Sequence, residues 1–287
     1  MAESPTHKFG QIIGDMLEAS MEEPLKKFVS KHDELYLDKK GPRKARGKKR
    51  KVTWQDKFGN SHDLDFVIER DGTYNKIGRP AAFIEIAWRR YTKHSRNKAQ
   101  EVQGAIMPLA ETYEQECPFL GIIIGGVFTQ GSINQLESLG FKTLYFDYET
   151  IRGAFNVVGI DAYFKEDTPD DEVGRKVIAF NALSKQKKKK IEQELRKLKK
   201  DAINDFLRKM EQSIFRKIDS IRILPLYGQE LLASNIDDAI RYLDNYRITN
   251  NGLDFVKFEI YLRFSNGDKI DASFSSKNSA IEFLKNI

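Results

Sequence analysis

Residues 79–101 read RPAAFIEIAWRRYTKHSRNKAQE, and this stretch decides how the first half of the chain folds. The segment AAFIEIAW predicts a buried strand, because short apolar runs of this kind suit strands covered on both faces. One carboxylate, Glu85, interrupts the run, and an acid is costly to bury without a partner. Five basic residues follow at once: Arg89, Arg90, Lys93, Arg96 and Lys98. An acid at the end of such a strand, next to so many bases, indicates a functional site.

The composition is that of a soluble globular protein with an anionic partner. The chain has 287 residues, of which 40% are hydrophobic and 31% charged, enough for two modest domains. Its net charge of +6 favours nucleic acid or an anionic surface. The single cysteine, Cys117, excludes an intramolecular disulfide, so we expect a cytoplasmic protein. The longest apolar run, residues 119–128, is too short to span a bilayer, so no membrane partner is expected.

The first half of the chain alternates between helix and strand patterns. Apolar spacing predicts a helix over residues 9–31, and the segment 39–51, with nine Lys or Arg in thirteen residues, indicates a mobile basic loop. The remaining predicted elements are strands at 52–56 and 62–69 joined by a KFGN hairpin turn, a strand at 81–88, a helix at 95–115, a strand at 119–126, a helix at 132–140 and a strand at 142–148. This order predicts an α/β domain with a mixed central sheet.

The second half is predicted to hold a long basic helix and a small α+β domain. A helical pattern covers residues 170–218 and would reach about 70 Å if unbroken, so we expect a bend near SKQKKKK or a helix that bridges two domains. The tail then predicts strand, helix, hairpin and helix, without an evident internal repeat. We therefore expect three parts: a catalytic domain over 1–165, a helical connector over 166–218, and a domain for DNA recognition or dimerisation over 219–287.

Two acids are expected to meet where the second and third predicted strands pair. Side chains alternate along a strand, so Asp63 and Asp65 share one face, as do Glu85, Ala87 and Arg89. If the strands pair, Asp65 and Glu85 come together near a strand end. Two adjacent carboxylates repel each other, and a cation relieves that repulsion. Oxygen ligands suit magnesium, and magnesium beside basic residues suits a phosphodiester substrate.

The order helix, three strands, helix, strand, with acids on the second and third strands, resembles the PD-(D/E)XK nuclease superfamily, which includes restriction endonucleases. The resemblance covers about residues 9–147. DLDFVIE supplies Asp65 and FIEIA supplies Glu85, while GDMLE places Gly14 and Glu18 where many members carry a first-helix glutamate. It implies a restriction-endonuclease-like αβββαβ core.

The resemblance also implies a set of metal ligands. Asp65 and Glu85 would bind Mg²⁺ together with the backbone carbonyl of Ile86, and Glu18 would assist catalysis. The family's lysine, two residues after the third-strand acid, is Ala87 here. In some members this lysine moves to the following helix.

Lys98 is accordingly our first candidate for the amine that orients or deprotonates the attacking water, and Lys93 is the second. Arg89 shares a strand face with Glu85 but cannot act as a general base. Lys98 as a plain surface lysine is the competing interpretation.

The remaining bases are candidates for contact with double-stranded DNA. They lie in the basic loop and after the third strand: Lys48, Lys49, Arg50, Lys51, Arg89, Arg90 and Arg96. The competing interpretations are a solubilising loop, a salt bridge from Glu85 to Arg89 or Arg90, and a solvated helical face for Glu18. The four histidines show no metal-ligand spacing.

The resemblance thus implies a magnesium-dependent endodeoxyribonuclease, similar to a homodimeric type II restriction enzyme, that leaves 5′-phosphate and 3′-hydroxyl ends. Two other classes stay open. One is a DNA-binding protein of the same fold without catalysis, which the absence of a lysine at position 87 permits. The other is a structural or assembly protein that uses the long helix.

Overall fold

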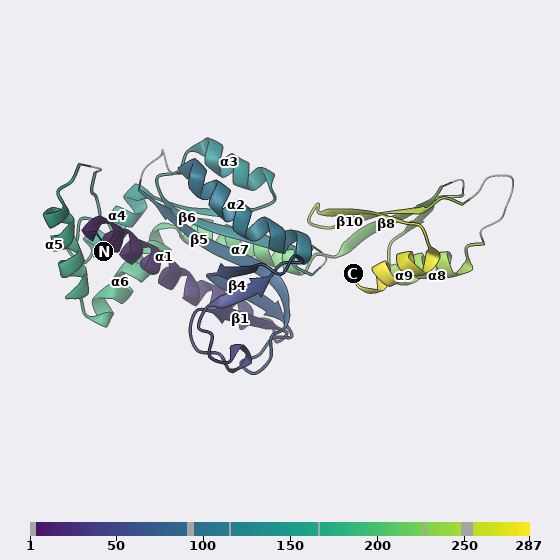
Figure 1. The fold of residues 1–287 in the computed structure, drawn as a ribbon, viewed down its shortest axis with the longest axis horizontal. Helices are drawn as coiled ribbons and strands as arrows, with labels where there is room; N and C mark the ends of the chain where they lie inside the picture. The colour runs from purple at the N-terminus through teal and green to yellow at the C-terminus, as the bar shows by residue number, and fades with distance from the viewer. Residues whose placement is uncertain (1–3, 91–94, 115, 166, 227, 248–254) are drawn as a thin grey trace. The chain divides into compact units, whose positions relative to one another are not determined.

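The computed structural model describes residues 4–90, 95–114, 116–165, 167–226, 228–247 and 255–287, without the side chains of residues 95, 96 and 98 (Figure 1). The chain forms two compact units, Met1–Met210 and Glu211–Ile287. The N-terminal unit contains, in chain order, α1 (Pro5–Val29), β1 (Leu35–Lys39), the 3₁₀ turn η1 (Lys44–Arg46), β2 (Val52–Gln55), β3 (Ser61–Leu64), β4 (Phe66–Arg70), β5 (Arg79–Arg89), α2 (Ser95–Thr112), β6 (Phe119–Gly126), α3 (Gln130–Ser138), β7 (Lys142–Asp147), α4 (Tyr148–Asn156), α5 (Asp170–Asn181) and α6 (Lys185–Leu198). Helix α7 (Lys200–Ile214) crosses the boundary between the units.

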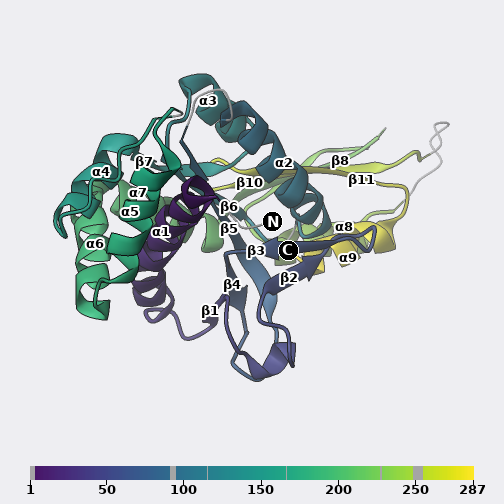
Figure 2. The same cartoon turned by 60° about the vertical axis from the view of Figure 1, so that its left-hand side comes forward.

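A mixed five-stranded sheet organises the N-terminal unit, as the alternating pattern predicted. Its order is β1-β4-β5-β6-β7, with antiparallel pairs up to β5 and parallel pairs from β5 to β7. Helices α2 and α3 cover one face, and α1 lies on the other (Figures 1 and 2). The unit is therefore α/β, with its central strands buried on both faces.

Helix α1 lies close to the sheet because the helix presents an apolar stripe and the sheet presents a glycine. Ser4 caps its first turn by accepting a bond from the His7 N–H, and its apolar stripe includes Phe9, Ile13 and Leu17. On β6, a Cβ at Gly125 would lie only 2.4 Å from Leu17 Cδ1. The glycine thus permits an approach that holds the middle of α1 against the sheet.

The first strand of the sheet differs from the predicted one. Strand β1 (Leu35–Lys39) pairs with β4, whereas β2 pairs only with β3 in a separate two-stranded ribbon. The predicted strand 62–69 is divided by a bend at Asp65, so its first half belongs to the ribbon and its second half to the sheet. Asp65 therefore lies where the chain passes from the ribbon to the sheet.

The expected bend near SKQKKKK is confirmed, because the predicted helical pattern over residues 170–218 is broken at residues 182–184. A second break at Lys199 was not predicted, so the segment forms three helices, and Ser184 caps α6 by accepting from the Lys187 N–H. Helices α5 and α6 both contact α1, so residues up to 210 belong to the N-terminal unit. Their apolar stripes, which include Val173 and Ile191, are buried against that unit.

The C-terminal unit is a four-stranded antiparallel sheet with two helices on one face (Figure 1). Its elements are β8 (Ile218–Pro225), β9 (Leu231–Ala233), α8 (Ile236–Asn245), β10 (Phe258–Phe264), β11 (Lys269–Phe274) and α9 (Lys277–Lys285), in the sheet order β11-β10-β8-β9. Its buried core combines the inward side chains of β8 and β10 with those of both helices. An α+β fold was predicted here, although β9 was not.

This unit contains an internal repeat that the sequence analysis missed. The order strand, strand, helix occurs twice, and matching residues are 41 positions apart. Asn235 and Ser276 cap the two helices in the same way, by accepting from the N–H three residues on. The buried pairs Ala239 and Ala280, then Leu243 and Leu284, also match.

The repeat extends to the exposed face of the sheet. Arg222 binds Glu230 with a shortest N···O distance of 2.7 Å, and Arg263 binds Asp271 at the same distance. These two ion pairs are again 41 residues apart. Strands β8 and β10 pair antiparallel through the matching residues Ile221 and Leu262, so an approximate twofold axis relates the two halves.

No helix in the described part of the chain is long and apolar enough to cross a membrane.

Candidate functional site

The structure brings Asp65 and Glu85 to the same place on adjacent strands. Phe66 of β4 pairs with Ile84 of β5, and continuing this register by one residue places Asp65 opposite Glu85. The Ile86 N–H donates to Asp65 Oδ2 at 2.7 Å, which fixes this carboxylate beside the Glu85 backbone. Both acids are half-buried, so a ligand can reach them.

Glu18 approaches this pair from α1. Burial, followed by the negative charge of Asp65, raises the pKa of Glu18 to about 7, and Asp15 adds a smaller effect of the same sign. Carboxylates influence each other this way only when they are near neighbours in a poorly solvated place. Three elements, α1, the β3–β4 junction and β5, therefore contribute one acid each to a common region.

Lys40 is a basic residue of this region that the sequence analysis did not single out. It follows β1 directly, and its positive charge lowers the pKa values of both Glu18 and Asp15, opposing the effect of burial. Its position could not be inferred from the sequence, because no strand was predicted at β1 and Lys40 itself was assigned to the basic loop.

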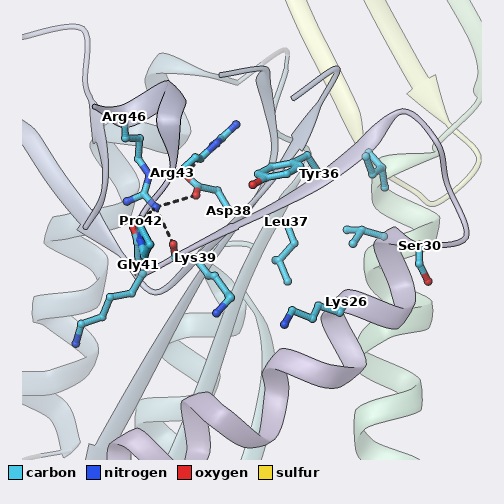
Figure 3. Close-up of a pocket in the computed structure, with 13 residues that line it drawn as sticks. Lys26, Ser30, Tyr36, Leu37, Asp38, Lys39, Gly41, Pro42, Arg43 and Arg46 are labelled. Carbon is cyan, nitrogen blue, oxygen red and sulfur yellow. Dashed lines mark hydrogen bonds and ion pairs between the residues drawn. The ribbon is translucent and has the colours of Figure 1, made fainter. Parts of the chain in front are cut away.

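A pocket of about 400 Å³ lies between the end of α1, β1 and the loop that follows, and Lys40 is part of its lining (Figure 3). Lys26 and Lys39 also contribute to its lining. Lys26 and Lys39 both bind Glu22, so part of their charge is neutralised. Lys40 thus belongs both to this pocket and to the region of Glu18 and Asp15.

Position 87, where the family has its lysine, is surrounded by apolar side chains. Ala87 is 1% exposed and packs in the hydrophobic cluster under α2, together with Phe83 and Ala99. A lysine there would bury its amine among apolar side chains. The candidate Lys93 and the side chain of Lys98 lie outside the described residues, although the backbone of Lys98 is in the first turn of α2.

The basic loop, which was expected to be mobile, is held to the sheet by two arginines. Arg43 is 2% exposed and binds Glu69 through two parallel bonds of 2.6 and 2.8 Å, and it also binds Asp38 at 2.8 Å. Arg46 binds Asp38 at 3.2 Å and the backbone carbonyls of Lys39 and Gly41, as Figure 3 shows in part. Two of the nine bases therefore anchor the loop from inside.

The anchored loop displays most of its other bases to solvent. Lys48, Lys49 and Arg50 are exposed, as predicted for phosphate contacts. Lys51 is also exposed but binds Asp63 at 2.6 Å, so Asp63 faces solvent on the ribbon, away from the acid pair. The loop thus presents a fixed cluster of positive charge.

The two arginines at the end of β5 have partners within the protein. Arg89 binds Glu101 at 3.1 Å, and the Arg90 guanidinium lies 4.3 Å from the centre of the Phe164 ring. These contacts favour a packing role for Arg90 in the free protein. The side chain of Arg96 lies outside the described residues.

The acid pair fits a magnesium site in its chemistry. In the described part of the chain, no three His, Cys, Asp or Glu side chains form a ready-made metal cluster. Magnesium commonly takes only one or two carboxylates and completes its shell with water and substrate oxygens. The crowding of Glu18 and Asp65 is a repulsion that a bound cation would relieve.

Comparisons with known proteins name no relative. No family model and no curated protein matches the chain. A crystal structure titled "Protein of Unknown Function AF1548" is 11% identical, with a TM-score of 0.30, over 69% of this chain and 98% of that one. A likeness this weak carries no argument about fold or function.

Proposed function

We propose that the protein is a magnesium-dependent endodeoxyribonuclease with a restriction-endonuclease-like core, similar to type II restriction enzymes. The observation that carries the proposal is the bond from the Ile86 N–H to Asp65, because it holds Asp65 next to Glu85, and the family resemblance rests on these two acids. The mixed sheet, the acid on α1 and the ordered basic loop give further support.

The residues of the site divide into two roles in this proposal. Asp65, Glu85 and the Ile86 carbonyl oxygen would hold the metal, and Glu18 would lie beside them. When bound, magnesium supplies Lewis acidity toward a phosphoryl oxygen and lowers the pKa of a water molecule. The exposed bases of the loop hold DNA phosphates by charge. The amine of Lys98, or of Lys93, orients the attacking water.

A DNA-binding protein without catalysis is the second candidate. The buried Ala87 favours it, since the usual place of the amine holds only a methyl group. Cleavage and binding assays on the same preparations distinguish the two functions, and absence of both activities would leave the structural or assembly role.

The test is incubation of the protein with supercoiled and linear plasmids in Mg²⁺ or in EDTA, followed by mapping of the fragment ends. We expect cleavage in Mg²⁺ alone, with 5′-phosphate and 3′-hydroxyl ends. Asp65→Asn and Glu85→Gln should each abolish cleavage and keep DNA binding. Asp63→Asn is the matched control, because Asp63 lies two residues away and faces solvent. Binding without cleavage in the unaltered protein would select the second candidate.

A further inference from the structure

The two halves of the repeat in the C-terminal unit differ most at their outer strands. Strand β9 has three residues, whereas the matching strand β11 has six. A very short edge strand is one way in which proteins prevent unwanted strand pairing. The sheet of this unit therefore has one short, protected edge strand, β9, and one long edge strand, β11.

The long edge of β11 has backbone groups in position to pair. The Phe264 N–H donates to the Asp268 carbonyl at 3.0 Å, so in the alternating antiparallel pattern the even-numbered residues of β11 bond β10. The N–H and C=O groups of Lys269, Asp271 and Ser273 consequently point to the other side. In the described part of this unit, β11 pairs with β10 alone.

The core is incompletely covered at the same edge. The inward side chains of β11, Ile270, Ala272 and Phe274, are only half-buried, whereas those of β10 are buried. A further strand beside β11 would cover part of this apolar surface. The edge thus offers backbone bonds and apolar contact together.

The charges along β11 indicate which partner pairs with it. We propose that β11 pairs antiparallel with β11 of a second copy of the chain. When two β11 strands pair symmetrically, their core-facing side chains lie on the same side of the joint sheet only if one residue lies opposite the same residue of the other copy. Centring on Ile270 places Lys269 opposite Asp271 twice, so the edge complements itself. Centring on Asp271 would instead place two acids together.

Nucleic acid is a poor alternative occupant of this unit. Residues 211–287 contain ten Lys or Arg and eleven Asp or Glu, which gives a net charge of −1. Phosphate-binding surfaces need an excess of bases. The proposal is independent of the nuclease activity, since it depends only on the C-terminal sheet.

The first test blocks the backbone edge in the full-length protein. Asp271→Pro removes an N–H that points away from β10 and lies in the paired segment, so it breaks no backbone bond within the sheet. Glu230→Pro is the matched control, because Glu230 is the equivalent residue 41 positions earlier and each change also removes an ion pair with an arginine. Sedimentation equilibrium should give a dimer for the unaltered chain and for Glu230→Pro, and a monomer for Asp271→Pro. A monomeric unaltered chain, or a dimer that survives Asp271→Pro, would overturn the proposal.

The second test uses charge and depends less on strand geometry. Asp271→Lys should weaken the dimer roughly tenfold, since two like-charge contacts replace two opposite ones. Adding Lys269→Asp to it should restore the affinity. Glu230→Lys, the equivalent change in the first repeat, removes the matching internal ion pair with Arg222 and should leave the dimer intact. Equal weakening by Glu230→Lys, or no recovery in the double variant, would contradict pairing through β11.

Discussion

The crowding of Glu18 against Asp65 has a measurable consequence for stability. The pKa of Glu18 is about 7 in the folded protein and near 4.5 as a free side chain. A raised pKa means that the folded state prefers the protonated acid. The stability that Glu18 contributes is therefore complete below about pH 4.5 and is lost as the pH rises through about 7.

Glu18→Gln should remove this dependence. In EDTA, the melting temperature of Glu18→Gln relative to the unaltered protein should increase steadily between about pH 5 and pH 8, the range that spans the raised pKa. Magnesium should reverse the trend, because a bound cation favours the ionised carboxylate. Thermal melts across this pH range, with and without Mg²⁺, measure both effects. A difference in melting temperature that does not vary with pH would show that Glu18 is well solvated and outside the site.

In the proposed nuclease, the source of the catalytic amine is the second question at the scale of single residues. Ala87 is packed under α2, so the proposal takes the amine from another element. Lys98→Ala should lower the cleavage rate at least ~100-fold, the lower end of general acid–base contributions. Lys93→Ala and Lys40→Ala should have smaller effects. If Lys40→Ala gave the largest decrease in rate, the amine would instead belong to the end of β1, near Glu18.

Among the elements, the loop between β1 and β2 depends on one buried arginine. Arg43→Ala would leave the carboxylates of Asp38 and Glu69 buried without their main partner, and such a change costs about 3 to 5 kcal/mol of unfolding free energy. Arg43→Lys should recover only part of this, because an ammonium cannot form both bonds of the fork. Lys44→Ala, the exposed neighbour, should stay within about 0.5 kcal/mol in the same urea titration. Equal stability of Arg43→Ala and Lys44→Ala would refute the anchoring role.

The contacts of Arg43 also explain why β1 was not predicted from the sequence, whereas other strands of the sheet were. The apolar runs of β5 and β6 predicted those strands, because burial on both faces leaves a local signature. The run of β7 also predicted a strand, although only its alternate residues Leu144 and Phe146 are buried. Strand β1, LYLDK, has no such local signature. Its Asp38 is compatible with a buried strand because Arg43 and Arg46 fold back onto it, and these interactions are not visible in local sequence.

The candidate site shows the same limit. Asp65 and Glu85 were identified from strand alternation and from the family's order of acids, and both are local features. The bend at Asp65, which separates ribbon from sheet, has no Gly or Pro to mark it. Lys40 became visible only once α1 and β1 were side by side. The C-terminal repeat stayed hidden because its two halves share few identical residues and β9 is very short.

For the molecule as a whole, positive charge is divided unevenly. The C-terminal unit has a net charge of −1, so the N-terminal 210 residues carry 38 basic and 31 acidic side chains, a net charge of +7. Affinity for DNA and its dependence on salt should therefore reside in the N-terminal unit. Each phosphate that a base neutralises contributes about 0.9 to the slope of log K against log salt.

Replacing Lys48, Lys49 and Arg50 with Ser should weaken binding to all DNA sequences alike and reduce the salt slope by roughly 0.9 for each phosphate that is no longer neutralised. The charge-matched control makes the same change to Ser at three exposed bases of the C-terminal unit, Lys217, Arg247 and Lys285. It removes the same net charge, so any effect of overall charge appears in both proteins. Fluorescence anisotropy with a labelled duplex across a salt series gives both slopes. If the two triple variants flattened the slope equally, net charge alone would explain binding, and the ordered loop would have no special part in holding phosphates.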